Sequence, residues 1–475
     1  MSSIQAINPR TGEVDFRVHA VDRRAIEQIA QRLKTAQPAW AGDLQFRLDT
    51  LHAWAESLQA HAQALGEALM HDTGRRMLSH FEVAGMVQRI HYWHERAPVL
   101  LGPTEDKRSQ TADDVVYRHQ RVPYGLLGVI SPWNFPLTLS LVDAIPALFA
   151  GCAVLIKPSE ITPRFASVLQ ASIAAVPALA AVMEVVVGDA ETGSALVDNV
   201  DIICFTGSVA TGRKVAVRAA ENFIPACLEL GGKDPAIVLA DADIGAAADA
   251  LLRSAAGTCG QACMSIERIY AHTSIFESLR DALINRAAEL SFNTPDIHSG
   301  ALYPFIDPRQ AQKVGEQLQD ALDKGAVLHH GGPPENIDGG YWMRPTILSN
   351  IHQGMLLMQE ETFGPLLPLM PFTTDQDAVE MANDSKYGLS GSVFGEEQHA
   401  LRVGAQLNVG AVGINDASMT ALIFDIEKQS FASSGLGPSR MGDEGLLRFL
   451  RTKALMMQRA QPTPLKFLDE AGLPA

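Results

Sequence analysis

The chain has 475 residues, of which 47% are hydrophobic and 19% charged, and its formal net charge is −16. This length predicts two to three domains, and the acidic balance argues against a nucleic-acid-binding surface, which would need a basic stripe. The first residues, "MSSIQAINPRTGEVDF", lack an apolar signal segment, and the longest apolar run, residues 144–156, is too short to cross a bilayer. We therefore expect a cytoplasmic protein without a membrane segment, whose five cysteines are reduced thiols.

Residues from about 22 to 100 are expected to form successive helices, because apolar residues recur there at the spacing of one helical face. His91 and His94 form an HxxH pair in this region, for which a packed or solvated helix face is favoured over a metal site. After residue 120, short apolar runs alternate with helical segments. We predict strands at 125–130, 152–157, 182–187, 201–207, 227–232 and 236–240, and a second α/β series from about 241 to 432. The predicted fold class is therefore α/β, with parallel units in two domains and a cleft between them.

Polar residues follow three of the predicted strands, at the sheet edge where α/β proteins bind ligands. The amide of Asn134 in "SPWNFP" is a neutral donor suited to an oxyanion, although Asn and Pro also mark ordinary turns. Lys157 and Glu160 in "IKPSE" could hydrogen-bond a ribose. Gly207 and Ser208 in "FTGSVATG" could bind a phosphate at a helix N-terminus. The chain has no GxGxxG between a strand and a helix, so a dinucleotide would bind without the usual glycine fingerprint.

Two thiols and two carboxylates complete the reactive groups. Cys259 and Cys263 lie in "GTCGQACMSIERIY", and either could be a nucleophile if a neighbour activates it, although buried structural thiols are commoner. Glu229 in "LELGGKDP" stands before a Gly-Gly pair and could be a general base or a surface carboxylate. Glu361 lies near an aromatic ring in "QEETFGP".

Taken in order, these motifs resemble the aldehyde dehydrogenase superfamily along nearly the whole chain. The resemblance rests on "NPRTGEV", "SPWNFP", "IKPSEITP", "FTGSVATG", "LELGGKDP", "GQAC", "EETFGP" and "YGLSGSVF". Cys263 also follows Glu229 at the interval that the family pattern expects. Among the two thiols, the resemblance therefore favours Cys263 as the nucleophile and Cys259 as a structural thiol.

The resemblance implies a role for each site residue. Glu229 would be the general base that activates water, and Asn134 would stabilise the oxyanion. The implied cofactor-binding residues are Trp133, Lys157, Glu160, Gly207, Ser208, Glu361 and Phe363. The implied substrate-lining residues are Phe135, Leu139, Val142, Ala262 and Met264. No metal ion is expected.

The implied reaction is the NAD-dependent oxidation of an aldehyde to the carboxylic acid through a thiohemiacetal and a thioester on Cys263. NAD is favoured because a carboxylate such as Glu160 repels the 2′-phosphate of NADP, although use of NADP is possible. None of the expected substrate-lining residues is basic, so an uncharged, fairly apolar aldehyde is expected. One segment departs from the family, which often has FGGxKxSGxGR where this chain has "SFASSGLGPSR" at 430–440. Such loops border the substrate entrance, so the departure bears on the choice of substrate.

The resemblance also implies the domain organisation. A Rossmann-like cofactor-binding domain would comprise residues 1–104 and 123–229, and an α/β catalytic domain residues 230–433. A β-hairpin oligomerisation arm would comprise 105–122 and 454–462, with 434–453 as a returning segment. Such an arm would complete a neighbour's sheet in a homodimer or homotetramer.

Three other functions are compatible with the same thiol. A CoA-acylating aldehyde dehydrogenase would transfer the acyl group to a second thiol, but loss of the base is common in that branch and Glu229 is retained. A non-catalytic relative would have a binding role, which the joint presence of Cys263, Glu229 and Asn134 disfavours. The thiol could also hydrolyse esters without a cofactor.

Overall fold

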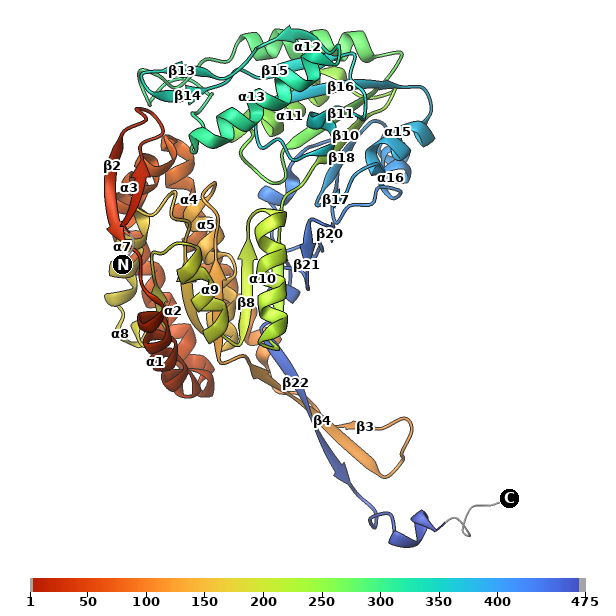
Figure 1. The fold of residues 1–475 in the computed structure, drawn as a ribbon. Helices are drawn as coiled ribbons and strands as arrows, with labels where there is room; N and C mark the ends of the chain where they lie inside the picture. Colours follow the sequence, from red (N-terminus) through yellow and green to blue (C-terminus); the bar gives the residue numbers. More distant parts are fainter. Residues whose placement is uncertain (1–2, 470–475) are drawn as a thin grey trace.

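The computed structural model describes residues 3–469 and begins with a hairpin of β1 (Ser3–Ile7) and β2 (Val14–His19) (Figure 1). The predicted helical region follows as α1 (Arg23–Gly42), α2 (Leu44–Ala60), α3 (Ala62–Thr73) and α4 (Arg76–Leu101). Helix α1 begins where the Asp22 side chain accepts the Ala25 N–H, and it buries Ile26 and Leu33 on its inner face. The helical spacing in the sequence therefore predicted this region correctly.

The first large sheet has six strands in the order β21-β9-β8-β5-β6-β7. Its parallel strands are β5 (Leu126–Ile130), β6 (Ala153–Lys157), β7 (Met183–Val185), β8 (Ile202–Thr206) and β9 (Ala226–Glu229), with β21 (Gly435–Leu436) antiparallel at one side. The connecting helices are α5 (Pro136–Leu141), α6 (Ala144–Ala150), α7 (Phe165–Ala174), α8 (Pro177–Ala180), α9 (Ala190–Asn199) and α10 (Val209–Glu221). Because the main strands are parallel, the loops after them gather at one edge of the sheet.

The second large sheet has seven strands in the order β12-β15-β16-β11-β10-β18-β19. They are β12 (Val327–His330), β15 (Thr346–Ser349), β16 (Leu366–Phe372), β11 (Ile266–His272), β10 (Asp234–Val238), β18 (Gly391–Phe394) and β19 (Val412–Ile414). The accompanying helices are α11 (Ile244–Ala256), α12 (Phe276–Ala288), α13 (Pro308–Asp323), α14 (Leu356–Gln359), α15 (Asp375–Asn383) and α16 (Glu397–Gly404). Figure 1 shows this green-to-blue part above the first sheet.

The boundary of about 241 between the two predicted α/β series lies too late, whereas the division at residue 230 implied by the resemblance already separates the strand at 236–240 from the first series. This strand is β10, and it pairs with β11 and β18 of the second sheet. The chain leaves the first sheet at Glu229 and crosses to the second through Leu230, Gly231 and Gly232. Short apolar runs look alike in both sheets, so the sequence pattern could not show on which side of the crossing β10 pairs.

Smaller elements connect these layers. Short strands pair as β13 (Glu335–Ile337) with β14 (Gly340–Trp342), and β17 (Tyr387–Gly388) with β20 (Phe431–Ala432). The short helices are η1 (Gly257–Gly260), η2 (Met419–Ala421), α17 (Glu444–Leu447) and η3 (Leu465–Leu468). Within residues 3–469, no helix has both the length and the apolar character needed to cross a bilayer.

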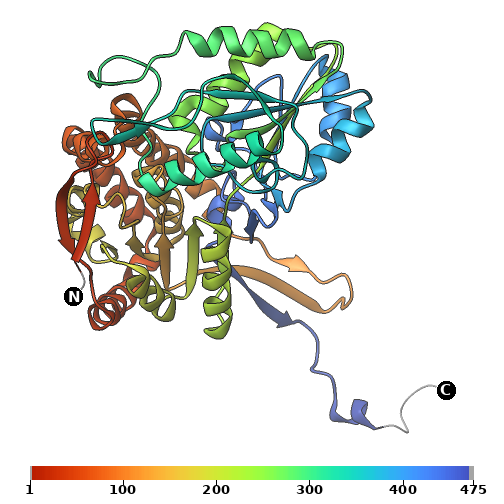
Figure 2. The same ribbon diagram turned by 45° about the horizontal axis from the view of Figure 1, so that its top comes forward.

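An arm projects from the body of the molecule in both views (Figures 1 and 2). It is a sheet of β3 (Lys107–Arg108), β4 (Val115–Pro123) and β22 (Leu450–Gln458). The last strand therefore begins at Leu450, earlier than the segment 454–462 of the sequence prediction. Apolar side chains such as Met456 lie exposed on it.

Candidate active site

The crossing between the two sheets brings the predicted base to the predicted nucleophile. Strand β9 ends at Glu229, and three residues later Gly232 packs against the loop that carries Cys263. A Cβ atom on Gly232 would lie 2.5 Å from the carbonyl oxygen of Cys263 and 2.6 Å from a carboxylate oxygen of Asp234. Only glycine allows this approach, so the "LELGG" and "GQAC" motifs meet at one point.

The loop before Cys263 is held in an unusual backbone conformation. Thr258 and Cys259 have φ angles of 60° and 56°, which place both in the left-handed region. The buried Gln261 side chain donates to the carbonyls of Thr258 (3.0 Å) and Pro304 (3.1 Å) and accepts the Ile306 N–H (2.9 Å). Strained backbone held by surrounding bonds is a common feature of functional loops, and here it fixes the position of the thiol that follows.

The two thiols of this loop differ in their surroundings. Cys259 is 1% exposed, and burial raises its pKa far above the usual value. Cys263 remains partly exposed. Loss of hydration raises the pKa of Cys263 to about 12, and the carboxylates of Asp234, Glu361 and Glu229 add to that rise, whereas the Lys428 ammonium opposes it. Cys263 is thus the accessible thiol, and Lys428 is the cation that favours its ionised form.

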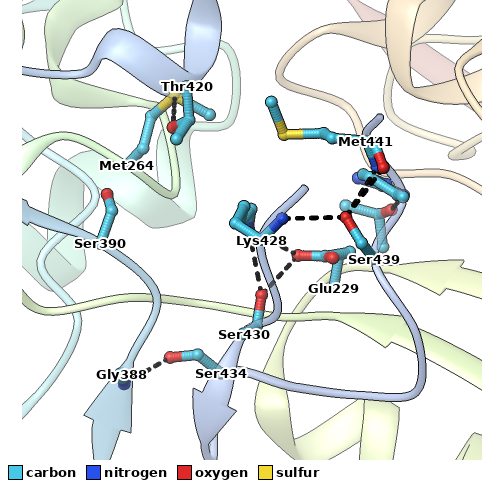
Figure 3. Close-up of polar contacts among 12 residues, drawn as sticks. Glu229, Met264, Gly388, Ser390, Thr420, Lys428, Ser430, Ser434, Ser439 and Met441 are labelled. Carbon is cyan, nitrogen blue, oxygen red and sulfur yellow. Dashed lines mark hydrogen bonds and ion pairs between the residues drawn. The ribbon is translucent and has the colours of Figure 1, made fainter. Parts of the chain in front are cut away.

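Glu229 is held by residues that the sequence analysis did not identify (Figure 3). Its Oε2 accepts a hydrogen bond from the Ser430 hydroxyl at 2.7 Å and lies 3.4 Å from the Lys428 ammonium. Although burial alone would raise the pKa of Glu229, the charges of Lys428 and Arg440 and the Ser430 bond lower it below its usual value. Ser430 is the first residue of the segment that departs from the family pattern. That departure was the one feature of the sequence that could have pointed to these contacts.

Asn134 points its amide at the same loop. The side chain is buried, and its Nδ2 donates to the carbonyl of Gln261 at 3.0 Å, two residues before the predicted nucleophile. The backbone carbonyl of Asn134 accepts a hydrogen bond from the guanidinium of Arg75, which is fully buried. Arg75 was not predicted from the sequence, because nothing in the helical pattern of this region marks a buried cation.

The predicted ribose and phosphate residues lie along the edge of the first sheet. Lys157 ends β6 and is buried, and its ammonium lies 3.5 Å from Oε2 of Glu160, whose side chain is 49% exposed. Gly207 and Ser208 follow β8, where the Ser208 hydroxyl caps α10 by accepting the Thr211 N–H. A partly exposed carboxylate beside an ammonium suits ribose hydroxyls, and a helix N-terminus suits a phosphate. These residues therefore fit a dinucleotide.

A second carboxylate, Glu361, lies on the other side of the crossing. Its Oε1 accepts the Gly232 N–H at 3.3 Å, and burial together with the nearby Glu267 raises its pKa to about 7. The buried Lys233 ammonium fixes the loop 361–363 by contacting Glu267 and the Thr362 hydroxyl, each at 2.7 Å. The sequence analysis did not predict this buried pair.

Two aromatic rings stand next to this loop. The Trp133 and Phe363 rings meet edge to face, with their centroids 5.4 Å apart. Phe363 has a φ of 55°, and its N–H donates to Oε1 of Glu267 at 2.7 Å. The structure therefore brings together two predicted cofactor residues that are far apart in the sequence.

The predicted substrate residues have separate surroundings in the structure. Phe135 packs under the Arg75 guanidinium at 5.0 Å, and Val142 is buried. Met264 is fixed by Ser418, which donates to its carbonyl at 2.9 Å, and by the Thr420 hydroxyl, 3.3 Å from its sulfur. A cavity of about 130 Å³ is lined by these two hydroxyl residues, Lys428 and nine others, and the predicted residues, including Leu139 and Ala262, are not among them.

The histidine pair of α4 packs beside a third histidine. The rings of His91 and His94 lie 5.8 and 5.6 Å from the ring of His52 on α2. Across residues 3–469, no cluster of three or more His, Cys, Asp or Glu side chains has the arrangement of a metal site.

Comparison with known proteins identifies the class. A sequence model of the aldehyde dehydrogenase family matches residues 1–455. The 4,4'-diapolycopene aldehyde oxidase of Methylomonas sp is 34% identical over 94% of this chain and 84% of its own length. Lactaldehyde dehydrogenase of Escherichia coli is 33% identical over 96% and 95%.

Solved structures agree with this result. PutA from Anabaena variabilis has a TM-score of 0.96 and 46% identity, covering 98% of this chain and 100% of its own. Betaine aldehyde dehydrogenase from Staphylococcus aureus, in complex with NAD+, has a TM-score of 0.90 and 29% identity, covering 99% and 94%. The fold and the matches define an α/β oxidoreductase. The chain belongs to the aldehyde dehydrogenase family.

Proposed function

We propose that this protein oxidises an aldehyde to the corresponding carboxylic acid, with NAD as the hydride acceptor and Cys263 as the nucleophile. The observation that carries the proposal is the meeting of three groups at one crossing. The partly exposed Cys263 thiol follows a backbone loop bonded to the Asn134 amide, and that loop packs against Gly232, three residues after Glu229. A nucleophile, a neutral donor and a carboxylate base are the groups that this chemistry needs.

The first half of the reaction would use Cys263 and Asn134. As the thiolate attacks the aldehyde carbon, the carbonyl oxygen gains negative charge. The Asn134 Nδ2, already near the loop, would donate to that oxygen together with the Cys263 N–H. By analogy with other oxyanion holes, one such donor stabilises the transition state by about 2.7–4 kcal/mol.

The cofactor would lie along the edge of the first sheet. Lys157 and Glu160 would hold the adenosine ribose, Gly207 and Ser208 would lie near the pyrophosphate, and Glu361 would lie near the nicotinamide ribose. Trp133 and Phe363 would line the nicotinamide side of the site. When bound, the nicotinamide group accepts hydride. Betaine aldehyde dehydrogenase, a relative of this fold, has been solved with NAD+, which supports the choice of cofactor.

The second half would use Glu229. After hydride has left, the acyl group is a thioester on Cys263. The Glu229 carboxylate would take a proton from water, and the resulting hydroxide would release the acid. The ion pair with Lys428 keeps Glu229 ionised, so the base is available at neutral pH.

The substrate stays a prediction. The sequence favours an uncharged, fairly apolar aldehyde because Phe135, Leu139, Val142, Ala262 and Met264 are apolar. Lys428, which that reasoning did not include, is already paired with Glu229, and this supports an uncharged substrate over one that must displace the carboxylate. We also propose a cytoplasmic location and assembly as a homodimer or homotetramer through the arm, whose exposed Met456 supports a covered surface.

We also propose the domain division that the resemblance implies. Residues 1–104 and 123–229 would bind the cofactor, 230–433 would carry the nucleophile, and 105–122 with 454–462 would form the arm. Residues 434–453 return to the first sheet, where Gly435 pairs with Glu229.

A kinetic screen tests the proposal. The full-length protein is mixed with NAD or NADP and with aliphatic, aromatic and carboxylated aldehydes, and reduced cofactor and free acid are measured with and without coenzyme A. We expect NADH and free acid, with a higher kcat/KM for NAD than for NADP. CoA-dependent thioester would instead support the acylating alternative, and no reduced cofactor with any aldehyde would support a binding role.

A further inference from the structure

We propose that Lys428 and Ser430 are positioning residues that serve both reacting groups: they hold Glu229 in place, and the same Lys428 ammonium stabilises the Cys263 thiolate when it forms. The inference rests on the proposed function, in which Cys263 is the nucleophile and Glu229 is the general base. It concerns residues outside every motif that carries the family resemblance.

Glu229 is contacted by the side chains of both Lys428 and Ser430. The Lys428 ammonium lies 3.4 Å from Oε2 of Glu229 and 3.2 Å from the Ser430 hydroxyl, and that hydroxyl donates to the same Oε2 at 2.7 Å. The three side chains therefore form a closed triangle, drawn in Figure 3. The Lys428 and Glu229 side chains are only 10% and 12% exposed. With so little water around the pair, the attraction between its two charges is screened less than in a surface ion pair.

Hydrogen bonds hold the chain on both sides of this triangle. The Lys428 N–H donates to the Ser439 hydroxyl at 3.1 Å, and that hydroxyl donates to the carbonyl of Met441 at 3.0 Å. Further along, the buried Ser434 accepts the Gly388 N–H and donates to the carbonyl of Gly231, at 2.9 and 2.7 Å. Each side of the segment is thus tied to the rest of the protein, so its side chains are directed at the base.

A third bond pattern ties the segment to the base itself. Gly435 of β21 pairs with Glu229 of β9, and the Leu230 N–H donates to the carbonyl of Ser434 at 2.8 Å. The segment that departs from the family pattern therefore contacts the residue expected to activate water. The departure therefore bears on the general base as well as on the substrate entrance.

The charges facing each group show why one ammonium can serve both. Glu229 faces Lys428 and the buried guanidinium groups of Arg440 and Arg448. Both of these arginines also bond the buried carboxylate of Asp143. Arg440 and Arg448 are therefore partly neutralised by another partner, whereas Lys428 bonds to Glu229 and Ser430 and to no other charged group named among the described contacts.

Around Cys263 the balance is different. The groups that act electrostatically on the thiol are Lys428 and three acidic side chains, those of Asp234, Glu361 and Glu229. Burial raises the pKa of Asp234 to about 8 and that of Glu361 to about 7, so Glu229 is the acid kept ionised at neutral pH. Lys428 is the cation among these groups, and without it an ionised sulfur would face acidic groups alone, which would oppose formation of the nucleophile.

These contacts define a proton-balanced step. The S–H bond of Cys263 breaks, sulfur keeps the electron pair, and the proton leaves to solvent water. The site begins with a neutral thiol and a Glu229–Lys428 ion pair and ends with a thiolate beside the same ion pair, with the proton on water. Lys428 then faces two anions, and Glu229 stays ionised for the later activation of water.

Alkylation of Cys263 by iodoacetamide tests the thiol part without cofactor or substrate. The intact protein is labelled, and the modified peptide is quantified by mass spectrometry. Cys263 is the partly exposed thiol, and the other four cysteines are buried, so the site of labelling is separable. Because the reaction rate follows the thiolate fraction, Lys428→Met should slow labelling of Cys263 by roughly tenfold. Lys428→Arg, which keeps the charge, should stay near the unmodified protein.

Two matched measurements separate this role from a structural one. Lys324→Met removes an ion pair with Asp320 on α13 and should leave labelling unchanged. In single-turnover assays, Lys428→Met should move the acid limb of acyl-enzyme hydrolysis to higher pH, since Glu229 loses the cation that lowers its pKa. Ser430→Ala should move that limb in the same direction by less, and it gives the same test if Lys428→Met does not fold.

Equal labelling rates for the Met and Arg variants, with an unmoved acid limb, would overturn the inference. A labelling difference in a protein that forms no reduced cofactor would uphold the Lys428–Cys263 interaction and contradict the proposed dehydrogenase function instead. The two failures are therefore distinguishable.

Discussion

Two carboxylates flank the crossing between the sheets, and their surroundings are opposite. Glu229, at the end of β9, faces Lys428, Arg440 and the Ser430 hydroxyl, which outweigh the effect of burial and lower its pKa. Glu361, across Gly231 and Gly232, faces Glu267, and burial raises its pKa to about 7. The same residue type is therefore kept charged on one side and is half-protonated near neutral pH on the other. The comparison teaches that the neighbouring charges, more than burial, decide which carboxylate can act as a base.

The largest expected effect comes from the Cys263 thiol, whose pKa both carboxylates raise. Cys263→Ala should reduce dehydrogenase activity by roughly 10³-fold or more, because no covalent intermediate can form. Cys259→Ala, four residues earlier, should largely retain activity, since that thiol is buried and faces no base. Steady-state kinetics with NAD and one accepted aldehyde measures both. Equal losses in the two variants would contradict the assignment of the nucleophile.

The next largest effect is expected from the close packing of Gly232 against Cys263. Gly232→Ala places a Cβ 2.5 Å from the Cys263 carbonyl and 2.6 Å from a carboxylate oxygen of Asp234, so the two loops must separate. We expect a loss of roughly 1–3 kcal/mol in the free energy of unfolding, with a marked fall in kcat. Gly42→Ala is the matched control, because nothing lies within 4 Å of its added Cβ. Denaturant unfolding with activity assays checks it, and equal behaviour of the two variants would contradict the close packing.

The sequence suggested several residues of the candidate site but not the residues that hold Glu229. Asn134, Lys157 and Gly207 could be proposed because each lies at the end of an apolar strand, and the ends of parallel strands share one edge of a sheet. Lys428 and Ser430 follow no strand pattern, and they reach Glu229 only because β21 pairs beside β9. No local signal in the sequence encodes such a long-range contact.

The same limit applies to the fold. The helical region and both α/β series were predicted from periodicity and from alternating strands and helices. The boundary predicted at about 241 between the two series was too late, because the residues of β10 are buried on both faces and read like a strand of either sheet. The buried Lys233–Glu267 pair was not predicted either, since each residue alone resembles a surface charge.

A smaller effect concerns stability against pH. The pKa of Glu361 is raised in the folded protein, so its contribution to stability is present at low pH and is lost as pH rises toward about 7. Glu361→Gln stays neutral throughout. Relative to the unmodified protein, it should gain stability by roughly 1–3 kcal/mol as pH rises from 4.5 to 7.5. Thermal unfolding across this range tests the trend, and a constant difference between the two proteins would contradict the raised pKa.

The smallest effect concerns the partner of the base. Ser430→Ala removes one neutral hydrogen bond from Glu229 and leaves the Lys428 ion pair in place. We expect roughly a two- to tenfold loss in the rate of acid release, in line with about 0.5–1.5 kcal/mol for such a bond. Ser433→Ala, in the same segment, is the matched control, since no side-chain bond from it to Glu229 is among the described contacts. Similar rates of acid release in the two variants would contradict a role for Ser430 in holding Glu229.

The most direct measurement is the pre-steady-state formation of NADH by Glu229→Gln. We expect a rapid burst close to one NADH per subunit, because Cys263 and Asn134 still carry the first half-reaction. Acid release should then be slower by roughly 10²–10⁴-fold, the range of general base catalysis. Cys263→Ala should give no burst. Loss of the burst together with steady-state turnover in Glu229→Gln would contradict the claim that Glu229 activates water after the thioester has formed.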